Sequence, residues 1–375
     1  MSKIKILLVF GTRPEAIKMA PLLHEFKRCE EIFETKVCVT AQHREMLDQV
    51  LDFFAITPDY DLNLMRSGQS LHSLTSSIIQ STKKIFEEFK PDYLFVHGDT
   101  TTSMASALSA FYLGIRVCHV EAGLRTNNKL SPFPEELNRQ ITGRIADLHF
   151  APTEASRKNL LSENIKPDSI QVTGNTVIDA LLYSVGRVKN LDNNRTKEIL
   201  DFIGLSEKVV LVTGHRRENH GEGFESICSA LNYLASNEDD VKVIYPVHLN
   251  PLVLEPVNRH LAGVANILLT PPLAYPEFVW LMNKAKIILT DSGGIQEEAP
   301  SIGKPVLVMR NTTERPEAVD AGTVVLVGTD REKIILECHT LLNDQIRYEK
   351  MSLMHNPYGD GLASRKIVNH LKECL

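Results

Sequence analysis

The chain has 375 residues, of which 43% are hydrophobic and 23% are charged, and its formal net charge is −6. This length and composition are typical of a globular protein with two domains. The acidic balance argues against a general nucleic-acid binder or a membrane-surface protein, because both classes need basic surfaces. No stretch reaches the roughly 18 apolar residues of a membrane-spanning helix, so we expect neither a nucleic-acid nor a membrane partner.

Strand-like and helix-like patterns alternate through the first half of the chain. An apolar run at 5–10 predicts a strand, and the segment after it begins a helix with proline in its first turn. The predicted elements are strand 5–10, helix 14–28, strand 35–40, helix 44–54, helix 71–89, strand 92–97, helix 101–113, strand 116–120, helix 135–145, strand 148–152 and strand 170–173.

The alternation restarts after a polar stretch at 189–197. Helical patterns separate six further predicted strands, at 209–213, 241–246, 267–269, 287–290, 306–309 and 324–327. This rhythm predicts an α/β fold with two Rossmann-like, doubly wound parallel sheets. We place the first domain at 1–180 and the second at 181–361.

Six cysteines are scattered along the chain without a C-x-x-C pair: Cys29, Cys38, Cys118, Cys228, Cys338 and Cys374. Such spacing favours small buried hydrophobes in a reducing compartment over a disulfide framework or a zinc site. The N-terminal apolar run at 4–10 is too short for a signal peptide. We therefore expect a cytoplasmic protein.

Polar residues follow the predicted strands of both halves. In doubly wound sheets, ligands bind outside the carboxyl ends of the strands, so these residues are the informative ones. After the first strand, Arg13 and Lys18 flank a helix N-terminus, an arrangement that suits a diphosphate. Any one of these residues can be an ordinary helix cap, but their joint occurrence at the strand ends of two sheets favours a binding site.

The segment 289–300 organises the second half. A strand ends in Asp291-Ser292-Gly293-Gly294 and turns directly into a helix, which presents backbone N–H groups and a helix dipole to an anion such as phosphate. Glu298 falls about one turn later, where a carboxylate can accept the hydroxyl groups of a ribose. The alternative is an ordinary strand–helix turn with capping residues.

Three motifs are absent from the sequence. There is no G-x-G-x-x-G dinucleotide fingerprint, no P-loop and no H-E-x-x-H or cysteine pair for a metal. Oxidation through NAD and ATP hydrolysis are therefore disfavoured, and we expect neither a cofactor nor a metal.

Eight segments in order resemble the non-hydrolysing UDP-N-acetylglucosamine 2-epimerases over residues 4 to about 361. They are FGTRPEAIK at 10–18, TAQHREMLD at 40–48, HGDTTT at 97–102, VEAGLRT at 120–126, GNTVID at 174–179, GHRREN at 214–219, DSGGIQEEAP at 291–300 and TTERPE at 312–317. The resemblance implies the GT-B fold, with two Rossmann-like domains facing a cleft and a last helix, 362–375, that packs back on the first domain. It also implies a homodimer.

The family reaction inverts C2 of the sugar without a redox cofactor. The resemblance implies that the C2 proton and UDP leave to give 2-acetamidoglucal, and that UDP adds back after reprotonation of the other face. This chemistry needs acid–base carboxylates and groups that stabilise the departing diphosphate. The product, UDP-N-acetylmannosamine, would supply bacterial surface polysaccharide.

The resemblance also assigns residues. Asp99, Glu121 and Glu135 are the acid–base candidates, with the identity of the C2 base left open, and His215 helps to hold UDP and its leaving oxygen. The expected substrate-binding residues are Arg13, Lys18, Phe278, Ser292, Gly293, Gly294, Glu298 and Arg315. Gln42, Arg216 and His248 match part of a regulatory UDP-N-acetylglucosamine site, although Gly68 stands where some members carry arginine.

Other functions stay open. A GT-B glycosyltransferase would use the same uridine diphosphate half-site, and a nucleotide-sugar sensor would need no catalysis. Neither explains the carboxylates Asp99, Glu121 and Glu135. Hydrolysing epimerases and epimerases of modified sugars remain alternatives within the first class.

Overall fold

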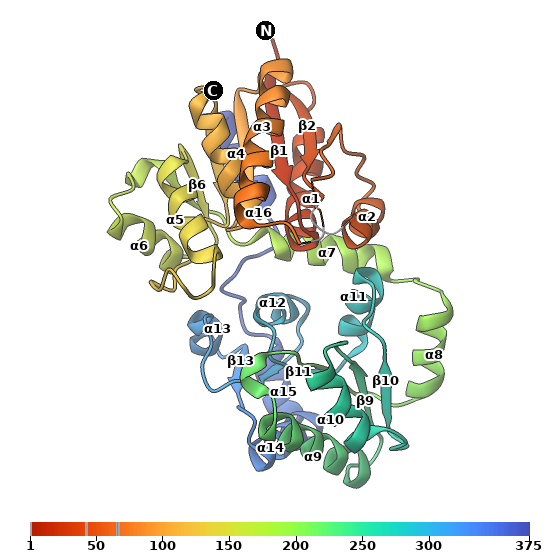
Figure 1. Cartoon of the computed structure of the whole chain (residues 1–375). Helices are drawn as coiled ribbons and strands as arrows, with labels where there is room; N and C mark the ends of the chain where they lie inside the picture. The colour runs from red at the N-terminus through yellow and green to blue at the C-terminus, as the bar shows by residue number, and fades with distance from the viewer. Residues whose placement is uncertain (1, 42–43, 65, 67) are drawn as a thin grey trace. The chain divides into compact units, whose positions relative to one another are not determined.

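The computed structural model describes residues 2–41, 44–64, 66 and 68–375. Internal contacts divide the chain into two compact units (Figure 1). The first comprises Met1–Ala180 and Tyr358–Leu375, and the second comprises Leu181–Pro357. The boundary falls inside helix α7 (Thr176–Val188).

A parallel sheet forms the centre of the first unit, with the strand order β3-β2-β1-β4-β5-β6-β7 among the described residues. The chain therefore builds outward from β1 and then reverses direction at β4, as in Rossmann folds, so the switch point lies between β1 and β4. The strands are β1 (Ile4–Phe10), β2 (Phe33–Val39), β3 (Tyr60–Asp61), β4 (Tyr93–His97), β5 (Arg116–Val120), β6 (Leu148–Ala151) and β7 (Ile170–Val172).

Helices cover this sheet (Figure 1). The continuous apolar run of β1 is consistent with helices on both faces, and its residues from Ile6 to Phe10 are fully buried. The helices are α1 (Arg13–Lys27), α2 (Arg44–Phe53), α3 (Leu71–Phe89), α4 (Thr101–Tyr112), α5 (Glu135–Ile145), α6 (Glu154–Ser162) and the start of α7, with a 3₁₀ turn at Pro167–Ser169.

The last helix, α16 (Ala363–Glu373), packs against α1 in the first unit (Figure 1). Its first turn is capped from a distance, because the Asp179 carboxylate accepts hydrogen bonds from the backbone N–H groups of Ala363 (3.2 Å) and Ser364 (2.7 Å). A carboxylate at a helix N-terminus satisfies free donors and interacts favourably with the helix dipole. Asp179 therefore fastens the end of the chain to the first unit.

A second parallel sheet, with the order β10-β9-β8-β11-β12-β13 among the described residues, forms the centre of the second unit. This is again the Rossmann order, with its switch point between β8 and β11. The strands are β8 (Lys208–Thr213), β9 (Val241–Pro246), β10 (Ile267–Thr270), β11 (Ile287–Thr290), β12 (Val306–Val308) and β13 (Val324–Leu326).

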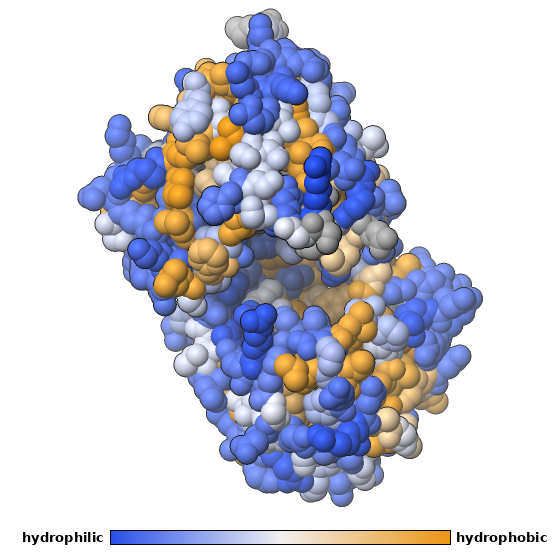
Figure 2. Space-filling view, viewed as in Figure 1, coloured by the Kyte–Doolittle hydropathy of each residue, from blue (hydrophilic) through white to orange (hydrophobic). Residues whose placement is uncertain are grey.

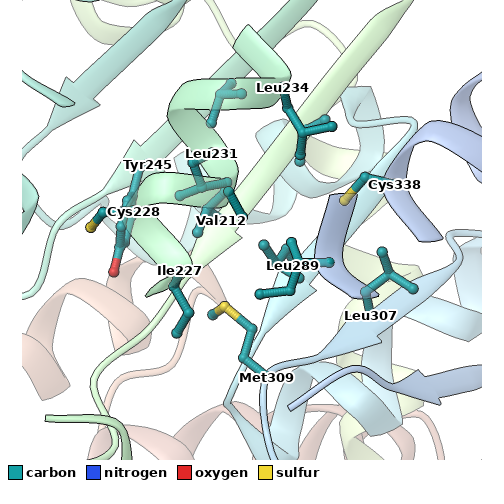
Figure 3. Packing of buried hydrophobic residues seen from close by; sticks show 14 of the residues in the cluster. Val212, Ile227, Cys228, Leu231, Leu234, Tyr245, Leu289, Leu307, Met309 and Cys338 are labelled. Atoms are coloured by element: carbon teal, nitrogen blue, oxygen red, sulfur yellow. The ribbon is translucent and has the colours of Figure 1, made fainter. Parts of the chain in front are cut away.

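The helices of the second unit include α8 (Asn194–Ile203), α9 (Glu222–Asn237), α10 (Pro251–Leu261), α11 (Tyr275–Lys284), α12 (Gly293–Glu298), α13 (Pro316–Asp320), α14 (Arg331–Asn343) and α15 (Gln345–Ser352). Two 3₁₀ turns lie at Arg217–Asn219 and Ala299–Ile302. Figure 3 shows part of the core between the sheet, α9 and α14, which includes Val212, Ile227, Leu231, Leu234, Leu289, Leu307 and Cys338.

The predicted fold of two doubly wound parallel sheets is confirmed. Several elements were not predicted, among them β3, α6, α7 and α8. The strand β3 has only two residues, too few to give a periodic signal. Helix α8 begins inside the polar stretch at 189–197. It was missed because the capping residue Asn193 and the charged residues after it conceal the buried face formed by Ile199 and Ile203.

The surface of both units is mainly hydrophilic in the view of Figure 2, with apolar patches between the polar side chains. On the first unit, Phe111 and Tyr112 at the end of α4 are 60% and 68% exposed. In the part of the chain that the structure describes, no helix is both long and apolar enough to cross a membrane.

Leu289 tests the packing of the second unit, because it is fully buried between the sheet and its helices. We expect Leu289→Ala to lower the free energy of unfolding by about 2–5 kcal/mol, the usual result of removing a buried leucine side chain. Denaturant titration measures the change. The exposed Leu205 is the matched control, since Leu205→Ala should change stability by less than about 0.5 kcal/mol. Equal effects of the two substitutions would contradict this core.

Candidate active site

A buried carboxylate joins the two sides of the switch point in the first sheet. Glu15, in the first turn of α1, accepts hydrogen bonds from the backbone N–H groups of Gly11 (3.1 Å) and Thr12 (2.8 Å). It also accepts one from the hydroxyl group of Thr100 (2.7 Å), which precedes α4. The turns after β1 and β4 are thereby held together, and these turns carry Arg13 and Asp99.

Gly11 shows how closely the ends of these strands pack. A Cβ atom at this position would lie 2.0 Å from Oγ1 of Thr40, which follows β2, and 2.7 Å from Oγ1 of Thr102 on α4. Only glycine allows the turn after β1 to approach so closely. The turn therefore brings the start of α1, including Arg13, to the carboxyl edge of the sheet.

Glu121 follows β5 with a left-handed backbone, at φ +60°, although it is not glycine. Such a conformation costs on the order of 1–3 kcal/mol and points to a functional role for the side chain. Its carboxylate forms a salt bridge with Lys18 and accepts a hydrogen bond from the Asn175 amide at 2.9 Å. The structure therefore brings together two predicted site residues. The family resemblance assigned Lys18 to substrate binding and Glu121 to acid–base catalysis.

The buried ring of His97 lies beside this carboxylate, with its Nε2 atom 3.6 Å from Oε2 of Glu121. Burial lowers the pKa of His97 to about 4; the negative charge of Glu121 opposes this shift, and Lys18 adds to it. At neutral pH the contact is therefore between a neutral imidazole and a carboxylate, and Lys18 is the cationic partner of Glu121.

Asp99 lies in the turn after β4 and is held from α5. Nη2 of Arg139 donates to its carboxylate at 2.7 Å, and the Asn138 amide donates to its backbone carbonyl at 3.0 Å. Burial raises the pKa of Asp99, and Glu121 and Glu135 raise it further, while Arg139 opposes the shift. A carboxyl group with a raised pKa near other carboxylates is suited to exchanging protons at neutral pH.

The adjacent residues Glu135 and Glu136 at the start of α5 have different environments. Glu136 is fully buried and accepts hydrogen bonds from the backbone N–H groups of Thr126 (3.0 Å) and Asn127 (3.1 Å). Although burial acts in the opposite direction, these bonds hold the pKa of Glu136 below its usual value. Glu136 thus orders the loop before α5, whereas Glu135 is half-buried and contributes its charge near Asp99.

The sequence predictions missed the residues that support these carboxylates. Arg139 carried a usable signal, because it lies one helical turn after Glu135 and its side chain can reach the same region. Asn175 lies in the segment 174–179, which entered the family resemblance without a role. Glu15 lay in a recognised segment, but its pairing with Thr100 spans 85 positions and requires the fold.

In the second unit, a different buried carboxylate organises the switch point. Asp291 follows β11 and accepts hydrogen bonds from the backbone N–H groups of His215 and Arg216, which follow β8, both at 2.8 Å. The Asn219 amide donates to the same oxygen at 3.3 Å. Asp291 therefore determines how the segment containing His215 leaves the sheet.

The His215 ring lies 3.4 Å from Asp291, measured from Nδ1 to Oδ1, and stacks on His248 with a centroid separation of 5.6 Å. Burial lowers the pKa of His215; Asp291 opposes this shift, and Arg216 and His248 favour it. His215, predicted to hold UDP, and His248, predicted to be regulatory, are thus neighbours. The third predicted regulatory residue, Gln42, lies outside the described residues.

The short helix α12 begins at Gly293 after Ser292, whose side chain does not cap it. A Cβ atom on Gly293 would lie 2.8 Å from Cζ of Arg315, so the guanidinium group rests against the glycine backbone. A Cβ atom on Gly294 would lie 3.3 Å from a carboxylate oxygen of Glu298. The two glycines therefore allow the predicted phosphate-binding Arg315 and the predicted ribose-binding Glu298 to lie close to the backbone at the start of α12.

Arg315 is itself held by Glu297, whose Oε1 accepts from Nε of Arg315 at 2.8 Å. The side chain is therefore oriented, and a guanidinium beside helix N–H groups is a good arrangement for a phosphate. Phe278 lies on α11 and is half-buried.

Two buried histidines of the first unit predict a pH dependence of stability. Burial lowers the pKa of His119 to about 3 and that of His97 to about 4, whereas an unfolded chain titrates its histidines at about 6.5. The unfolded state therefore binds more protons below about pH 6.5, so the free energy of unfolding falls as the pH falls from about 6.5 to 4.

His119→Gln should weaken this dependence, because glutamine keeps an amide donor for the Gly98 carbonyl, which lies 2.7 Å from Nε2 of His119, but does not titrate. Denaturant unfolding at several pH values measures both slopes. A slope equal to that of the wild type would contradict the neutral, buried state of His119.

The model of the family UDP-N-acetylglucosamine 2-epimerase matches residues 25–372. The UDP-N-acetylglucosamine 2-epimerase of Escherichia coli K12 is 59% identical over 371 residues, which cover 98% of each chain.

The similar solved structures include two with UDP-GlcNAc bound. The UDP-GlcNAc 2-epimerase of Neisseria meningitidis bound to UDP-GlcNAc is 52% identical, with a TM-score of 0.87 over 99% of this chain and 100% of that chain. The enzyme of Methanocaldococcus jannaschii in complex with UDP-GlcNAc and UDP is 32% identical, with a TM-score of 0.78 and the same coverage. With a family match over nearly its whole length, the chain belongs to the UDP-N-acetylglucosamine 2-epimerase family.

Proposed function

We propose that the protein catalyses the reversible inversion of C2 that converts UDP-N-acetylglucosamine to UDP-N-acetylmannosamine. The observation that carries the proposal is the set of carboxylates at the carboxyl edge of the first sheet, where Glu121 and Glu135 both act electrostatically on Asp99. Family membership indicates the substrate, and the carboxylates account for the chemistry. A glycosyltransferase or a nucleotide-sugar sensor would leave them without a role.

The proposed reaction is an elimination followed by a re-addition. A base removes the C2 proton, the C2–H electrons form the C1–C2 double bond, and the C1–O bond breaks so that UDP leaves with its electron pair. This step gives 2-acetamidoglucal and UDP. Protonation of C2 on the opposite face and return of UDP to C1 complete the inversion without any net oxidation.

The environments of the carboxylates suggest their roles. Glu121 contacts the ammonium group of Lys18 and the Asn175 amide, which both stabilise a carboxylate, so we assign it to proton removal. Asp99 has a raised pKa because it is buried, so we assign it to proton delivery. The two roles exchange in the reverse reaction, and Glu135 assists through its charge near Asp99.

The remaining predicted residues bind the nucleotide in this proposal. His215 contacts the leaving phosphate oxygen, and its ring donates a hydrogen bond to this oxygen as the diphosphate departs. Phe278 packs near the uracil, Arg216 and His248 contribute to a regulatory nucleotide-sugar site, and Arg13 contacts the diphosphate. Ser292, Gly293, Gly294 and Arg315 hold phosphate, and Glu298 holds the ribose.

We further propose that the protein is a cytoplasmic homodimer that supplies N-acetylmannosamine for surface polysaccharide. All six cysteines are free, and five are buried, as suits a reducing compartment. The exposed pair Phe111 and Tyr112 gives an apolar surface for a second copy. Light scattering at micromolar concentration measures the assembly, and a monomeric mass would refute the dimer.

The reaction is tested directly by incubating the protein with UDP-N-acetylglucosamine in heavy water without added NAD or metal. We expect UDP-N-acetylmannosamine with deuterium at C2, because the abstracted proton exchanges with solvent before reprotonation. Proton NMR measures both the product and the label. Free N-acetylmannosamine as the main product would indicate a hydrolysing enzyme, and an unlabelled C2 would exclude this elimination.

Amide replacements test the assignment of the carboxylates. Asp99→Asn and Glu121→Gln keep the shape of the side chain but remove its proton transfer, so turnover should fall by roughly 10²–10⁴-fold, the typical contribution of general acid–base catalysis. Glu135→Gln removes the charge that Glu135 places near Asp99, so it should also lower turnover. Calorimetry should show retained UDP binding. The exposed Glu31→Gln serves as the control. Turnover close to that of the wild type in all three variants would show that the chemistry lies elsewhere.

A further inference from the structure

The segment 174–179 is the last part of the first unit before the chain continues into the second. It contacts Tyr358 and Gly359, where the chain re-enters the first unit. Gly174 has φ +91° and Gly359 has φ +136°. A Cβ atom on Gly174 would lie 3.2 Å from Cα of Gly359, so the two backbones touch. The backbone N–H of Asn175 donates to the Tyr358 carbonyl at 2.7 Å, which fixes the outgoing segment to the returning one.

The buried side chain of Asn175 makes two further hydrogen bonds from this joint. Its Oδ1 atom accepts from the Val177 backbone N–H at 3.0 Å and so caps the first turn of α7. Its Nδ2 atom donates to Oε2 of Glu121 at 2.9 Å. The two polar atoms of the Asn175 amide therefore have different roles. The oxygen caps α7, and the nitrogen donates to the proposed catalytic carboxylate of Glu121.

Glu121 is contacted from several elements of the first unit. Its left-handed backbone follows a strand directly, and its side chain meets a cation from α1, Lys18, and a buried ring from β4, His97. Asp99, in the turn after β4, is the nearby carboxylate whose charge state Glu121 influences. Lys18 has a long side chain, whereas the Asn175 amide is short, buried and tied to the joint by its own backbone.

We infer that Asn175 is a positioning residue for the reaction, which holds the Glu121 carboxylate in place and in its charged form through the joint between the outgoing and returning segments. The inference rests on the proposed role of Glu121. It gives the segment 174–179 a function in catalysis beyond its structural role: Gly174 allows the backbone contact, Asn175 reaches the site, and Asp179 fastens α16.

Asn175→Asp and Asn175→Ala separate the two tasks of the amide. Aspartate keeps the oxygen that accepts from Val177, but it replaces the donor to Glu121 with a second carboxylate oxygen. Alanine removes both. We expect Asn175→Asp to lower kcat by about ten- to a hundred-fold or more, the usual worth of a hydrogen bond to a charged group, with little change in KM or in affinity for UDP. Asn175→Ala should be less impaired in kcat but should melt at a lower temperature.

A purely structural role predicts the opposite order, with Asn175→Asp close to wild type and Asn175→Ala impaired. The matched control is Asp179→Asn, which weakens the cap of α16 in the same segment without reaching Glu121. It should lower the melting temperature and leave the pH profile of kcat unchanged. The profile of Asn175→Asp should instead shift to higher pH, because loss of the donor and gain of a negative charge favour the protonated form of Glu121.

NMR with ¹³C-labelled glutamate gives a readout that does not depend on turnover, with the Glu121 signal assigned from Glu121→Gln. The inference predicts that Glu121 titrates at higher pH in Asn175→Asp than in the wild type. An unchanged titration would overturn it, as would wild-type kcat in Asn175→Asp. A wild-type protein that titrates as expected but does not epimerise UDP-N-acetylglucosamine would refute the proposed function, while the effect of Asn175 on the Glu121 carboxylate would stand.

Discussion

A buried carboxylate at the switch point of each sheet is the constraint on which both groups of site residues depend. Glu15 links the turns after β1 and β4, and Asp291 links the turns after β8 and β11. Each accepts backbone N–H groups that would otherwise lack partners at the ends of parallel strands. Loss of either carboxylate would leave these donors without this acceptor, at a cost of about 1–3 kcal/mol for a buried donor such as the Gly11 N–H. It would also release the turns that carry Arg13, Asp99 and His215.

With these turns fixed, the first unit can hold several carboxylates close together. Each one is balanced in a different way: Glu121 by Lys18, Asp99 by Arg139, and Glu136 by backbone N–H groups. The resulting environments differ in how strongly they favour the charged form, which is the property that an acid–base pair requires. The second unit instead gathers imidazole rings, a guanidinium group and helix N–H groups, which suit a diphosphate.

Much of the fold could be predicted because buried parallel strands are continuous apolar runs, as in β1 and β11, and the polar residues after them mark the carboxyl edge. The site could be predicted only where residues adjoin such strands. Asn175 and Arg139 were missed because their roles depend on contacts with Glu121 and Asp99 across 54 and 40 positions. The different environments of Glu135 and Glu136 could not be predicted either, because a helix turns adjacent residues to different faces and the fold decides which face is buried.

The central claim is that the bond between C1 of the sugar and UDP breaks while both fragments remain bound. Positional isotope exchange tests this most directly, with ¹⁸O placed in the oxygen that bridges C1 and the β-phosphate of UDP-N-acetylglucosamine. A cleaved diphosphate can rotate, so the account predicts that the label appears in non-bridging positions of the β-phosphate of recovered substrate, as measured by ³¹P NMR. Label confined to the bridging position while C2 is being inverted would contradict the account.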